Sequence, residues 1–373
     1  MNILVYDPAA SYGGALSILQ DFLKDILADD SNNYFFLVTS KDMLDPIARN
    51  KKNIRIININ NYKSSIFSRL IWDQYKLFKF IKDNKIDYVI SLQNTCNLFL
   101  KNIPQTIYMH QPRPFFVKKY RAFFTKKEVL VTYLRDVYMK LSTKNANSVI
   151  VQTQWYKKVV IDRYKLTDSK ISVIPPQIEI NDVKKMDVSK DVINIVKDIK
   201  KNNNYLGVYI ASPNIYKNFE VLLKFVSHFN NSSEKKVHLL FPFIGDENNY
   251  ANKISRLTKE LNIETYISFI GKQNRATIYY LYEETDALFF PSIIETYGLP
   301  LKEAMLHKIR IFAADLEYAK EVCGDYAIYF DPFNSDSLLK VFNEYRYYKI
   351  DEELVPNVGT KSYLDIIKDY EEN

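Results

Sequence analysis

Short apolar runs alternate with amphipathic helical patterns along nearly the whole of this 373-residue sequence. Runs such as 106–110 and 287–290 lack polar alternation, as expected for strands that are buried on both faces of a parallel sheet. Strands that alternate with helices predict a doubly wound α/β fold. A chain of this length is too long for one simple core. We therefore expect two such domains facing a central cleft, where the carboxyl ends of the strands would meet a ligand.

The patterns also predict where the domains begin and end. We expect an N-terminal domain over residues 1–180, a linker with a charged helix over 181–204, and a C-terminal domain over 205–355. A C-terminal helix is expected within 356–373, and its return to the N-terminal domain is one option. The expected strands are 3–6, 34–39, 54–57, 88–91, 106–110, 148–152, 171–174, 205–211, 237–243, 266–269, 287–290, 310–313 and 327–330. The expected helices are 15–27, 67–83, 126–144, 154–163, 218–229, 250–261, 276–282, 299–307, 335–345 and 361–370.

Cysteine usage and hydropathy exclude several classes of protein. The two cysteines, Cys96 and Cys323, lie far apart, which argues against a disulfide framework and against a cysteine metal site. The chain enters a strand at once, without the basic and apolar regions of a signal peptide. No window reaches the ~18 uninterrupted apolar residues of a membrane span. We expect a cytoplasmic protein, either free or peripheral at the inner face of the cell membrane, with no metal and no other cofactor.

The net charge of +7 is concentrated in one segment. Between Arg113 and Lys144, nine basic residues face only Glu128 and Asp136, an excess that equals the charge of the whole chain. Basic and aromatic residues on a helix suit an anionic membrane surface, and they also suit nucleic acid. The plain alternative is a solvated helix whose aromatics lie in the core. Of the two ligands we favour the membrane and expect no nucleic acid. The basic residues are Arg113, Lys118, Lys119, Arg121, Lys126, Lys127, Arg135, Lys140 and Lys144, interleaved with Phe115, Phe116, Tyr120, Phe123, Phe124, Tyr133 and Tyr138.

Two glutamates eight positions apart, Glu295 and Glu303, lie in a segment that suits a ligand. The apolar run 287–290 precedes them, and Gly298 and Pro300 open a helix whose first turn holds Glu303. Free amides at a helix start bind an anion such as a phosphate. A carboxylate can accept hydrogen bonds from two adjacent hydroxyls of a ribose or hexose. This combination suggests a nucleotide sugar, although a glutamate pair at this spacing is common by itself.

Further candidates follow other expected strands, at the strand ends where parallel sheets bind ligands. Gly13 and Gly14 let the backbone approach a diphosphate or an acceptor, or they serve only a turn, and neither a G-x-G-x-x-G fingerprint nor a P-loop lysine accompanies them. His110 ends a strand. A structural role is the commoner one for a lone histidine, and no partner suggests a metal site. Lys217 begins a helix, where a cation would suit a diphosphate, although most lysines are only surface charges.

Together these features resemble the GT-B glycosyltransferases of the retaining family 4. Residues 173–178 (VIPPQI) are similar to the family's linker entry, where Asn-Gly is commoner than Pro-Gln. In the first half only the glycine loop, His110 and 149–153 (VIVQT) are similar. The resemblance covers essentially the whole chain, and its specificity lies after Gly207. The matching segments there are, in order and spacing, 266–271 (YISFIG), 281–287 (LYEETDA), 291–300 (PSIIETYGLP) and 303–305 (EAM).

The resemblance implies roles for the matching positions. Glu303 looks like the glutamate that holds the ribose hydroxyls, and Glu295 looks like the one near the transferred sugar. Lys217 looks like the basic residue on the diphosphate, and His110 resembles the histidine near the donor sugar. The remaining matches are the backbone amides of Tyr297, Gly298 and Leu299, which would contact sugar and phosphate, and Gly13 and Gly14, which resemble the loop beneath the diphosphate and acceptor.

One departure from the family concerns the diphosphate. The family often has Gly-Arg where this chain has Ala211 and Ser212, so one cation is missing there, and Lys272 or Arg275 could partly compensate. The resemblance implies a hexosyltransferase that moves a sugar from a UDP- or GDP-linked donor, with retention, to a glycan or polyprenyl-linked glycan of a surface polysaccharide. The alternatives are a non-catalytic sugar-nucleotide or membrane-binding subunit, which the missing arginine favours and the intact glutamate pair opposes, and a GT-B hydrolase or epimerase.

Overall fold

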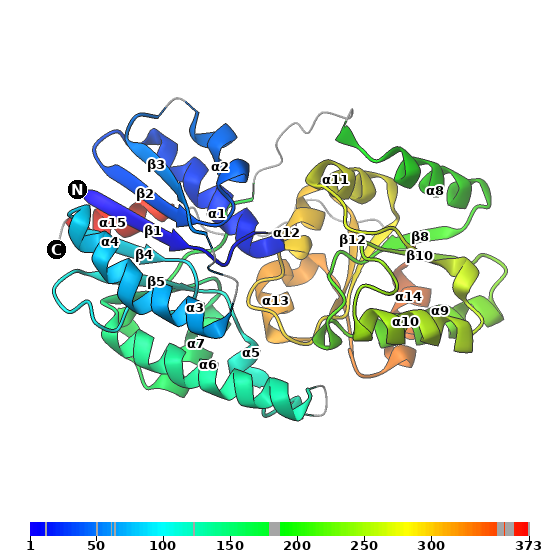
Figure 1. Cartoon of the computed structure of the whole chain (residues 1–373). Coiled ribbons are helices and arrows are strands. Elements are labelled where there is room, and N and C mark those ends of the chain that lie inside the picture. Colours follow the sequence, from blue (N-terminus) through cyan, green and yellow to red (C-terminus); the bar gives the residue numbers. More distant parts are fainter. Residues whose placement is uncertain are drawn as a thin grey trace. The chain divides into compact units, whose positions relative to one another are not determined.

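The chain folds into two compact units, each a parallel sheet with helices on both faces (Figure 1). The computed structural model describes residues 1–11, 13–49, 51–60, 62, 65–121, 124–178, 187–348, 354 and 362–371. The first unit comprises Met1–Gln177 and Val358–Asn373, and the second comprises Ile178–Asn357. Two doubly wound parallel sheets confirm the predicted fold class.

The first unit is built on a seven-stranded sheet in the order β3-β2-β1-β4-β5-β6-β7. Its strands are β1 (Asn2–Asp7), β2 (Asn33–Val38), β3 (Ile54–Asn58), β4 (Tyr88–Ser91), β5 (Gln105–Met109), β6 (Ser148–Val151) and β7 (Ile171–Val173). Its helices are α1 (Gly13–Asp25), α2 (Lys41–Ala48), α3 (Ile66–Leu70), α4 (Leu77–Asp83), α5 (Arg113–Phe116), α6 (Lys126–Asn145), α7 (Gln154–Tyr164) and α15 (Tyr363–Glu371).

The second unit is built on a six-stranded sheet in the order β10-β9-β8-β11-β12-β13. Its strands are β8 (Tyr205–Val208), β9 (Val237–Phe241), β10 (Ile267–Phe269), β11 (Ala287–Phe290), β12 (Arg310–Ala314) and β13 (Ile328–Phe330). Its helices are α8 (Lys190–Lys201), α9 (Phe219–Ser232), α10 (Asn249–Glu260), α11 (Arg275–Glu284), α12 (Leu299–Leu306), α13 (Glu317–Cys323) and α14 (Ser335–Tyr345).

The strand order reverses at one place in each sheet. In the first unit the chain adds β2 and β3 on one side of β1 and then places β4 on the other side. In the second unit β8 is flanked in the same way by β9 and β11. In open parallel sheets the crevice at such a reversal, outside the carboxyl ends of the strands, is where ligands bind.

The charged helix α8, expected within the linker, is part of the second unit. It buries Val192, Val196 and Ile199 along one face, and the backbone N–H of Ser189 before it donates to Thr277 Oγ1 at 3.0 Å. Such a stripe fixes a helix to a neighbouring surface rather than leaving it solvated. The first part of the expected linker, residues 181–186, lies outside the described residues.

The helix expected over 67–83 is broken into α3, a π-helical segment (Ile71–Lys76) and α4. The π segment turns Asp73 inward, where its carboxylate accepts hydrogen bonds from the hydroxyls of Tyr6 and Tyr62 and from Gln93 Nε2. Single π turns inside α-helices frequently mark functional sites. Because Tyr6 precedes the end of β1 and Gln93 follows β4, this network lies at the carboxyl edge of the sheet.

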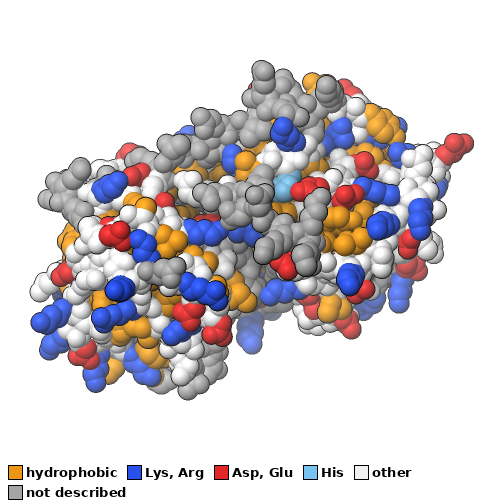
Figure 2. Space-filling view, turned by 90° about the horizontal axis from the view of Figure 1, so that it is seen from above, with side chains coloured by type: hydrophobic (Ala, Val, Ile, Leu, Met, Phe, Trp, Pro, Cys, Tyr) orange, Lys and Arg blue, Asp and Glu red, His pale blue; other side chains and the backbone are white. Residues whose placement is uncertain are grey.

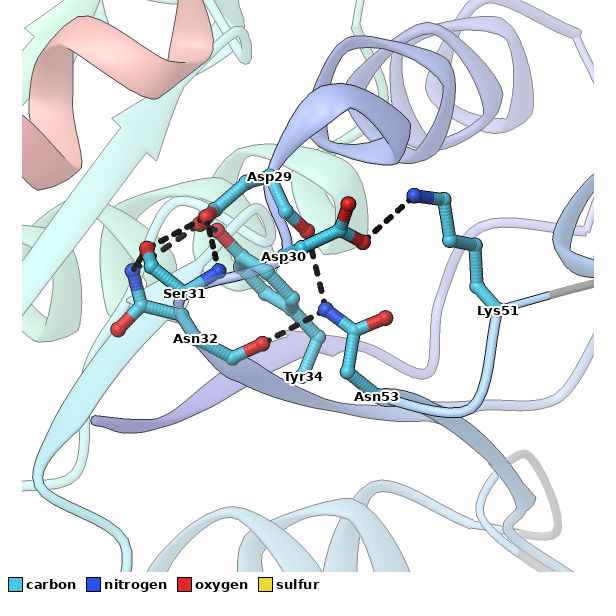
Figure 3. Close-up of polar contacts among 7 residues, drawn as sticks. All are labelled: Asp29, Asp30, Ser31, Asn32, Tyr34, Lys51 and Asn53. Carbon is cyan, nitrogen blue, oxygen red and sulfur yellow. Dashed lines mark hydrogen bonds and ion pairs between the residues drawn. The ribbon is translucent and has the colours of Figure 1, made fainter.

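At the opposite, amino-terminal edge, a polar turn joins α1 to β2 (Figure 3). Asp29 accepts hydrogen bonds from Ser31, Asn32 and the Tyr34 hydroxyl, while Asn53 Nδ2 donates to two backbone carbonyls of the turn. Burial alone would raise the pKa of Asp29, but these hydrogen bonds lower it to about 2. The turn therefore holds its charge at neutral pH and fixes the start of β2.

The core of the second unit is aromatic, and one glycine makes room for it. Phe289 in β11 lies 5.2 Å from Phe312 and 5.6 Å from Phe225, measured between ring centroids. A Cβ placed on Gly207 would stand 2.7 Å from both Leu239 Cδ2 and Phe289 Cδ2. Close packing leaves such side chains no space to move into, so only glycine fits this position of β8.

Replacing Gly207 with alanine is expected to destabilise the protein by about 1–3 kcal/mol, because the added methyl group overpacks this core. The midpoint of urea unfolding would measure the loss. Gly245→Ala is the matched control, since its Cβ would approach no atom more closely than Ser255 Oγ at 3.3 Å. Equal stability of the two variants would contradict the packing argument.

A buried histidine predicts a pH dependence of stability. His238 in β9 is 7% exposed, and burial lowers its pKa to about 4 from an ordinary 6.5. Between these values the unfolded chain binds the proton and the folded chain does not. The contribution to stability is therefore fully present above pH 6.5 and is lost as the pH falls towards 4.

We expect this linkage to amount to roughly 2–3 kcal/mol between pH 7 and pH 4.5. Urea unfolding of wild type and His238→Asn at both pH values would measure it, because the variant should show a pH effect smaller by this amount. His228→Asn is the control, since His228 is a surface residue with a 53% exposed side chain. An unchanged pH dependence in His238→Asn would refute the assignment.

Candidate active site

Two loops of the second unit are bound to each other where the strand order reverses. The loop after β8 carries Lys217, and the loop after β11 carries Glu295. The backbone N–H of Ile293 donates to the carbonyl of Tyr216 at 2.9 Å. Asn218, in the left-handed conformation and 8% exposed, donates from Nδ2 to the carbonyls of Pro291 and Pro332. These bonds hold the two loops in a fixed relation to the sheet.

Lys217 and Glu295 form an ion pair across these loops. Lys217 Nζ contacts Glu295 Oε1, and both side chains are only 16% exposed. Burial alone would lower the pKa of Lys217, but the facing carboxylate outweighs it and raises that pKa. The lysine is therefore charged at neutral pH. The sequence predicts the two residues in one site, and the structure brings them into direct contact.

Glu303 lies in the first turns of α12, on the other side of the same loop. Gly298 precedes the helix with a φ of +84°, and a side chain there would also crowd Leu301 and Phe290. Helix-start amides, here those after Gly298, lack a partner within the helix. Glu303 Oε2 accepts a hydrogen bond of 3.0 Å from the buried Tyr282 hydroxyl, and its side chain is 13% exposed.

Arg275, expected as a substitute cation for the diphosphate, lies next to the other glutamate. It begins α11, and its guanidinium is 4.0 Å from Glu303 Oε1, while its Nε donates to the Tyr279 hydroxyl at 2.7 Å. The structure therefore associates Arg275 with the Glu303 carboxylate rather than with the lysine.

In the first unit, Gly13 and Gly14 begin α1 and are both exposed. Gly13 has a φ of +62°, and no atom lies within 4 Å of the Cβ that another residue would carry. Two hydrogen bonds hold the loop before it. The Ser40 hydroxyl donates to the Ala10 carbonyl at 2.8 Å, and the Thr39 hydroxyl donates to the Pro8 carbonyl at 2.9 Å. A ligand could approach this helix start closely.

His110 follows β5 at the same edge of the first sheet and is partly buried. The Asn94 side chain accepts hydrogen bonds from the backbone N–H groups of His110 and Gln111, at 2.7 and 2.8 Å. Burial lowers the pKa of His110 to about 4, so the imidazole is neutral at physiological pH. It can therefore serve as a neutral hydrogen-bonding group but not as a cation.

Sequence reasoning missed three residues that hold candidate loops or side chains in place, Asn94 in the first unit and Asn218 and Tyr282 in the second. Asn218 and Asn94 both adopt the left-handed conformation, which asparagine tolerates better than most residues, so each asparagine after a strand was a weak signal. Tyr282, which donates to Glu303, carries no such signal because its partner lies twenty-one residues away. Among the described residues no group of three or more histidine, cysteine, aspartate or glutamate side chains could hold a metal ion.

Comparison with known proteins identifies a family over the second unit. Residues 191–346 match the model of the family described as glycosyl transferases group 1. The O-antigen chain mannosyltransferase RfbU of Salmonella typhimurium is 26% identical over 282 residues, which cover 74% of this chain and 71% of that protein.

Solved structures share the fold. Anabaena Alr3699/HepE, determined in complex with UDP-glucose, superposes with a TM-score of 0.71 at 16% identity, with full coverage of both chains. WaaG, a glycosyltransferase involved in lipopolysaccharide biosynthesis, gives a TM-score of 0.68 at 13% identity and covers 95% of this chain and 92% of its own. At such identities the likeness establishes the architecture.

Proposed function

The chain is a glycosyltransferase with the GT-B fold that carries a glycosyl transferases group 1 (family 4) domain, and from this premise we propose that its second unit binds a UDP- or GDP-linked sugar. The observation that carries the proposal is the set of charged side chains where the strand order reverses. Lys217 and Glu295 extend from the two loops that meet there, and Glu303 lies just beyond them in α12. A diphosphate, a sugar and a ribose need such a combination of charges.

In this proposal the donor lies along the start of α12. Glu303 accepts hydrogen bonds from the two ribose hydroxyls. The Tyr282 hydroxyl holds one of its carboxylate oxygens in place, and the side chain remains 13% exposed. The backbone amides of Tyr297, Gly298 and Leu299 donate to sugar and phosphate oxygens. Lys217, held in its charged form, stabilises the negative charge that develops on the leaving diphosphate. Arg275 adds positive charge beside Glu303.

For the first unit we propose ligand-binding roles for the glycine loop and His110. Gly13 and Gly14 let the backbone approach the diphosphate and acceptor, and the neutral His110 hydrogen-bonds the donor sugar. Transfer retains the configuration at the anomeric carbon. The leaving phosphate takes the proton of the acceptor hydroxyl as the new glycosidic bond forms and the bond to the diphosphate breaks. Glu295 orients the sugar in this scheme.

This role of Glu295 predicts a specific kinetic defect. Glu295→Gln is expected to lower kcat by about 10–100-fold with little change in the donor KM, because it removes a charged hydrogen bond of about 1.5–3 kcal/mol near the transferred sugar. Steady-state transfer assays would measure it. Glutamine retains an oxygen for Lys217 but removes the countercharge of this buried lysine, so the melting temperature of the variant must be measured beside its kinetics. A kcat equal to that of wild type would exclude Glu295 from the reaction.

For the acceptor we propose a glycan or a polyprenyl-linked glycan of a surface polysaccharide. The similarity to an O-antigen chain mannosyltransferase supports this class of acceptor. No helix among the described residues is long and apolar enough to cross a membrane. We propose that the protein reaches a lipid-linked acceptor from the membrane surface.

Helix α6 offers such a surface because its polarity is inverted. The side chains it buries include Thr132, Asp136 and Ser142, and Asp136 pairs inward with Arg163. Six of its exposed side chains are apolar, and the other five are cationic: Lys126, Lys127, Arg135, Lys140 and Lys144. By contrast, acidic, basic and hydrophobic side chains are intermixed on the face of the molecule shown in Figure 2. The exposed apolar side chains of α6 are Leu130, Val131, Tyr133, Leu134, Val137 and Leu141, with exposures from 38% to 61%.

We propose that this face of α6 rests on an anionic membrane with the surrounding lysines on the lipid headgroups. The aromatics expected to make this contact are mostly packed inside: Phe115 lies against Tyr156 and Tyr164, and Tyr120 and Phe124 are buried. Tyr133 is exposed as expected, and the other apolar side chains exposed on α6 are aliphatic. Phe123 lies outside the described residues. Sedimentation with anionic vesicles at low salt tests the proposal, and absence of binding would refute it.

A panel of nucleotide sugars tests the donor proposal. A true donor should raise the melting temperature by mass action, by an increment that grows with its concentration. The same donor should then lose its sugar only when a glycan or lipid-linked glycan is present. Failure of every UDP- and GDP-linked sugar to shift the melting temperature would refute the assignment, and consumption of the donor without acceptor would indicate a hydrolase.

A further inference from the structure

Three arginines of the first unit lie on helical segments that contact one another. Arg69 lies at the end of α3, Arg113 begins α5, and Arg135 lies in the middle of α6. They come from three separate elements, and the proposed donor site uses none of them. Two sets of side-chain contacts join the elements that carry them.

The first link joins the π-helical segment to α6. Gln74 Nε2 donates to the Tyr138 hydroxyl, which itself donates to the Cys96 carbonyl at 3.2 Å. About one turn before this contact on each helix lie Arg69 and Arg135. The hydrogen bond between the two helices therefore holds both arginines on adjacent surfaces.

The second link joins α5 to the start of α6. Arg113 Nη2 contacts Glu128 Oε1 at 2.9 Å, and Glu128 is seven residues, about two turns, before Arg135 on the same side of α6. Arg113 also lies over the Phe124 ring, 4.9 Å from its centroid. Desolvation lowers the pKa of Arg135, and the like charges of Arg113 and Arg69 lower it further, which agrees with three neighbouring guanidinium groups.

The carboxylates of this region are already committed elsewhere. Glu128 forms the capping box of α6 with Thr125 besides its contact with Arg113. Asp136 pairs with Arg163, and Asp73 is buried beneath two tyrosine hydroxyls. The part of the chain that the structure describes offers neither Arg69 nor Arg135 a carboxylate at ion-pair distance. Glu128 pairs with Arg113, and Arg69 interacts electrostatically with the buried Asp73 carboxylate. The three guanidinium groups still outnumber these two acids, which favours binding of an anion with several oxygens.

The position of the cluster indicates what carries that anion. Arg69 lies over the ring of Tyr62, whose hydroxyl joins the Asp73 network at the ends of β1 and β4, the edge that also holds Gly13. Exposed apolar side chains border the cluster on both helices, Leu70 and Tyr75 on one and Leu134 on the other. A ligand with an anionic group on an apolar chain would satisfy both features.

We infer that Arg69, Arg113 and Arg135 bind a phosphate or diphosphate group of the acceptor, as found at the head of a polyprenyl-linked glycan. Bidentate contacts from guanidinium groups suit phosphate oxygens better than lysine does. The cluster would hold the acceptor on the first unit. This inference rests on the proposed glycosyl transfer and names the chemistry that the acceptor presents.

Vesicle binding by the full chain tests the inference. One set of phosphatidylcholine vesicles contains polyprenyl diphosphate, and the other contains phosphatidylglycerol at matched surface charge. We expect wild type to bind the first set about tenfold more tightly, as one charge-assisted contact can provide. Arg135→Gln and Arg69→Gln should each lose this preference. Lys158→Gln, which removes one exposed charge from α7, should retain it.

A soluble arm separates the two sources of the phosphate. A water-soluble sugar phosphate that binds wild type but not Arg135→Gln, in the presence of excess UDP, would assign the site to phosphorylated glycans without lipid. The inference is overturned if neither probe is preferred by wild type, if both arginine variants keep the preference, or if Lys158→Gln loses it equally. Should Arg135→Gln fail to fold, the exposed Arg69→Gln decides.

The wild-type and variant proteins also provide an independent test of donor binding by thermal shift. The arginine variants should keep the thermal shift produced by the donor nucleotide sugar, because that site lies in the second unit. If wild type shows no shift with any nucleotide sugar, the proposed function fails while the vesicle result still reports on the arginines. If the shift is present and the vesicle preference is absent, only the arginine inference fails.

Discussion

Glu303→Ala is expected to lower kcat/KM for the donor by about 100-fold or more. The substitution removes the carboxylate that accepts two hydrogen bonds from the ribose hydroxyls. Each hydrogen bond to a charged group contributes about 1.5–3 kcal/mol. Since the ribose does not react, most of the loss should fall on the donor KM rather than on kcat. Steady-state kinetics with varied donor concentration would measure this division.

Two controls separate binding from folding. Alanine at position 303 leaves the buried Tyr282 hydroxyl without its acceptor, which would cost about 1–3 kcal/mol of stability. Glu303→Gln retains an oxygen for Tyr282 and should keep the melting temperature while still weakening the donor. Glu284→Gln removes a surface carboxylate paired with Lys200 and should leave the kinetics unchanged. A fully active Glu303→Ala protein would exclude the ribose assignment.

Removing α15 is expected to unfold the first unit. This helix inserts Tyr363, Ile366 and Ile367 into the core beside Phe22, and all three are at most 8% exposed. Burial of each such side chain contributes about 1.5–3 kcal/mol. The sum is comparable with the ~5–15 kcal/mol that stabilises a whole domain.

Hydrogen bonds to α1 fix the start of α15 in addition to the packing of its apolar face. Asp25 at the end of α1 accepts hydrogen bonds from the Ser362 hydroxyl and from the backbone N–H of Tyr363. A chain that ends before residue 362 should lose its cooperative thermal transition or precipitate. Within the full chain, Tyr363→Ala should lower the melting temperature clearly, and Lys368→Ala, on the exposed side, should not. A truncated protein that melts like the full chain would contradict this account.

The sequence predicts the fold well because parallel strands leave a strong local signal. The apolar run 287–290 is β11 residue for residue, and most expected strands lie within two residues of the observed ones. The expected helix 67–83 was wrong in its continuity, because tertiary bonds to Asp73 impose the π turn. The helices α2 and α13 were missed because each spans only two turns, too few for a helical period to stand out in the sequence.

The candidate site also has a part that the sequence predicts and a part that it does not. Motif order and spacing predict Lys217, Glu295 and Glu303, since the loops that carry them are short and follow recognisable strands. The contacts that define their chemistry come from tertiary structure. The Tyr282 hydroxyl on Glu303 and the association of Arg275 with that glutamate join positions that the sequence pattern does not relate. The inverted helix α6 was hidden for the same reason, because a mean composition does not reveal which side faces the sheet.

The two parts of the first unit, residues 1–177 and 358–373, have a consequence for how the protein is made. A ribosome must synthesise the entire second unit before it reaches the helix that completes the core of the first. During translation Phe22 and Tyr108 of the amino-terminal sheet therefore remain uncovered by Tyr363, while the second unit can already close its own core. The half that begins first is the half that finishes last, and the nascent chain is most exposed to aggregation through the surface that α15 will cover.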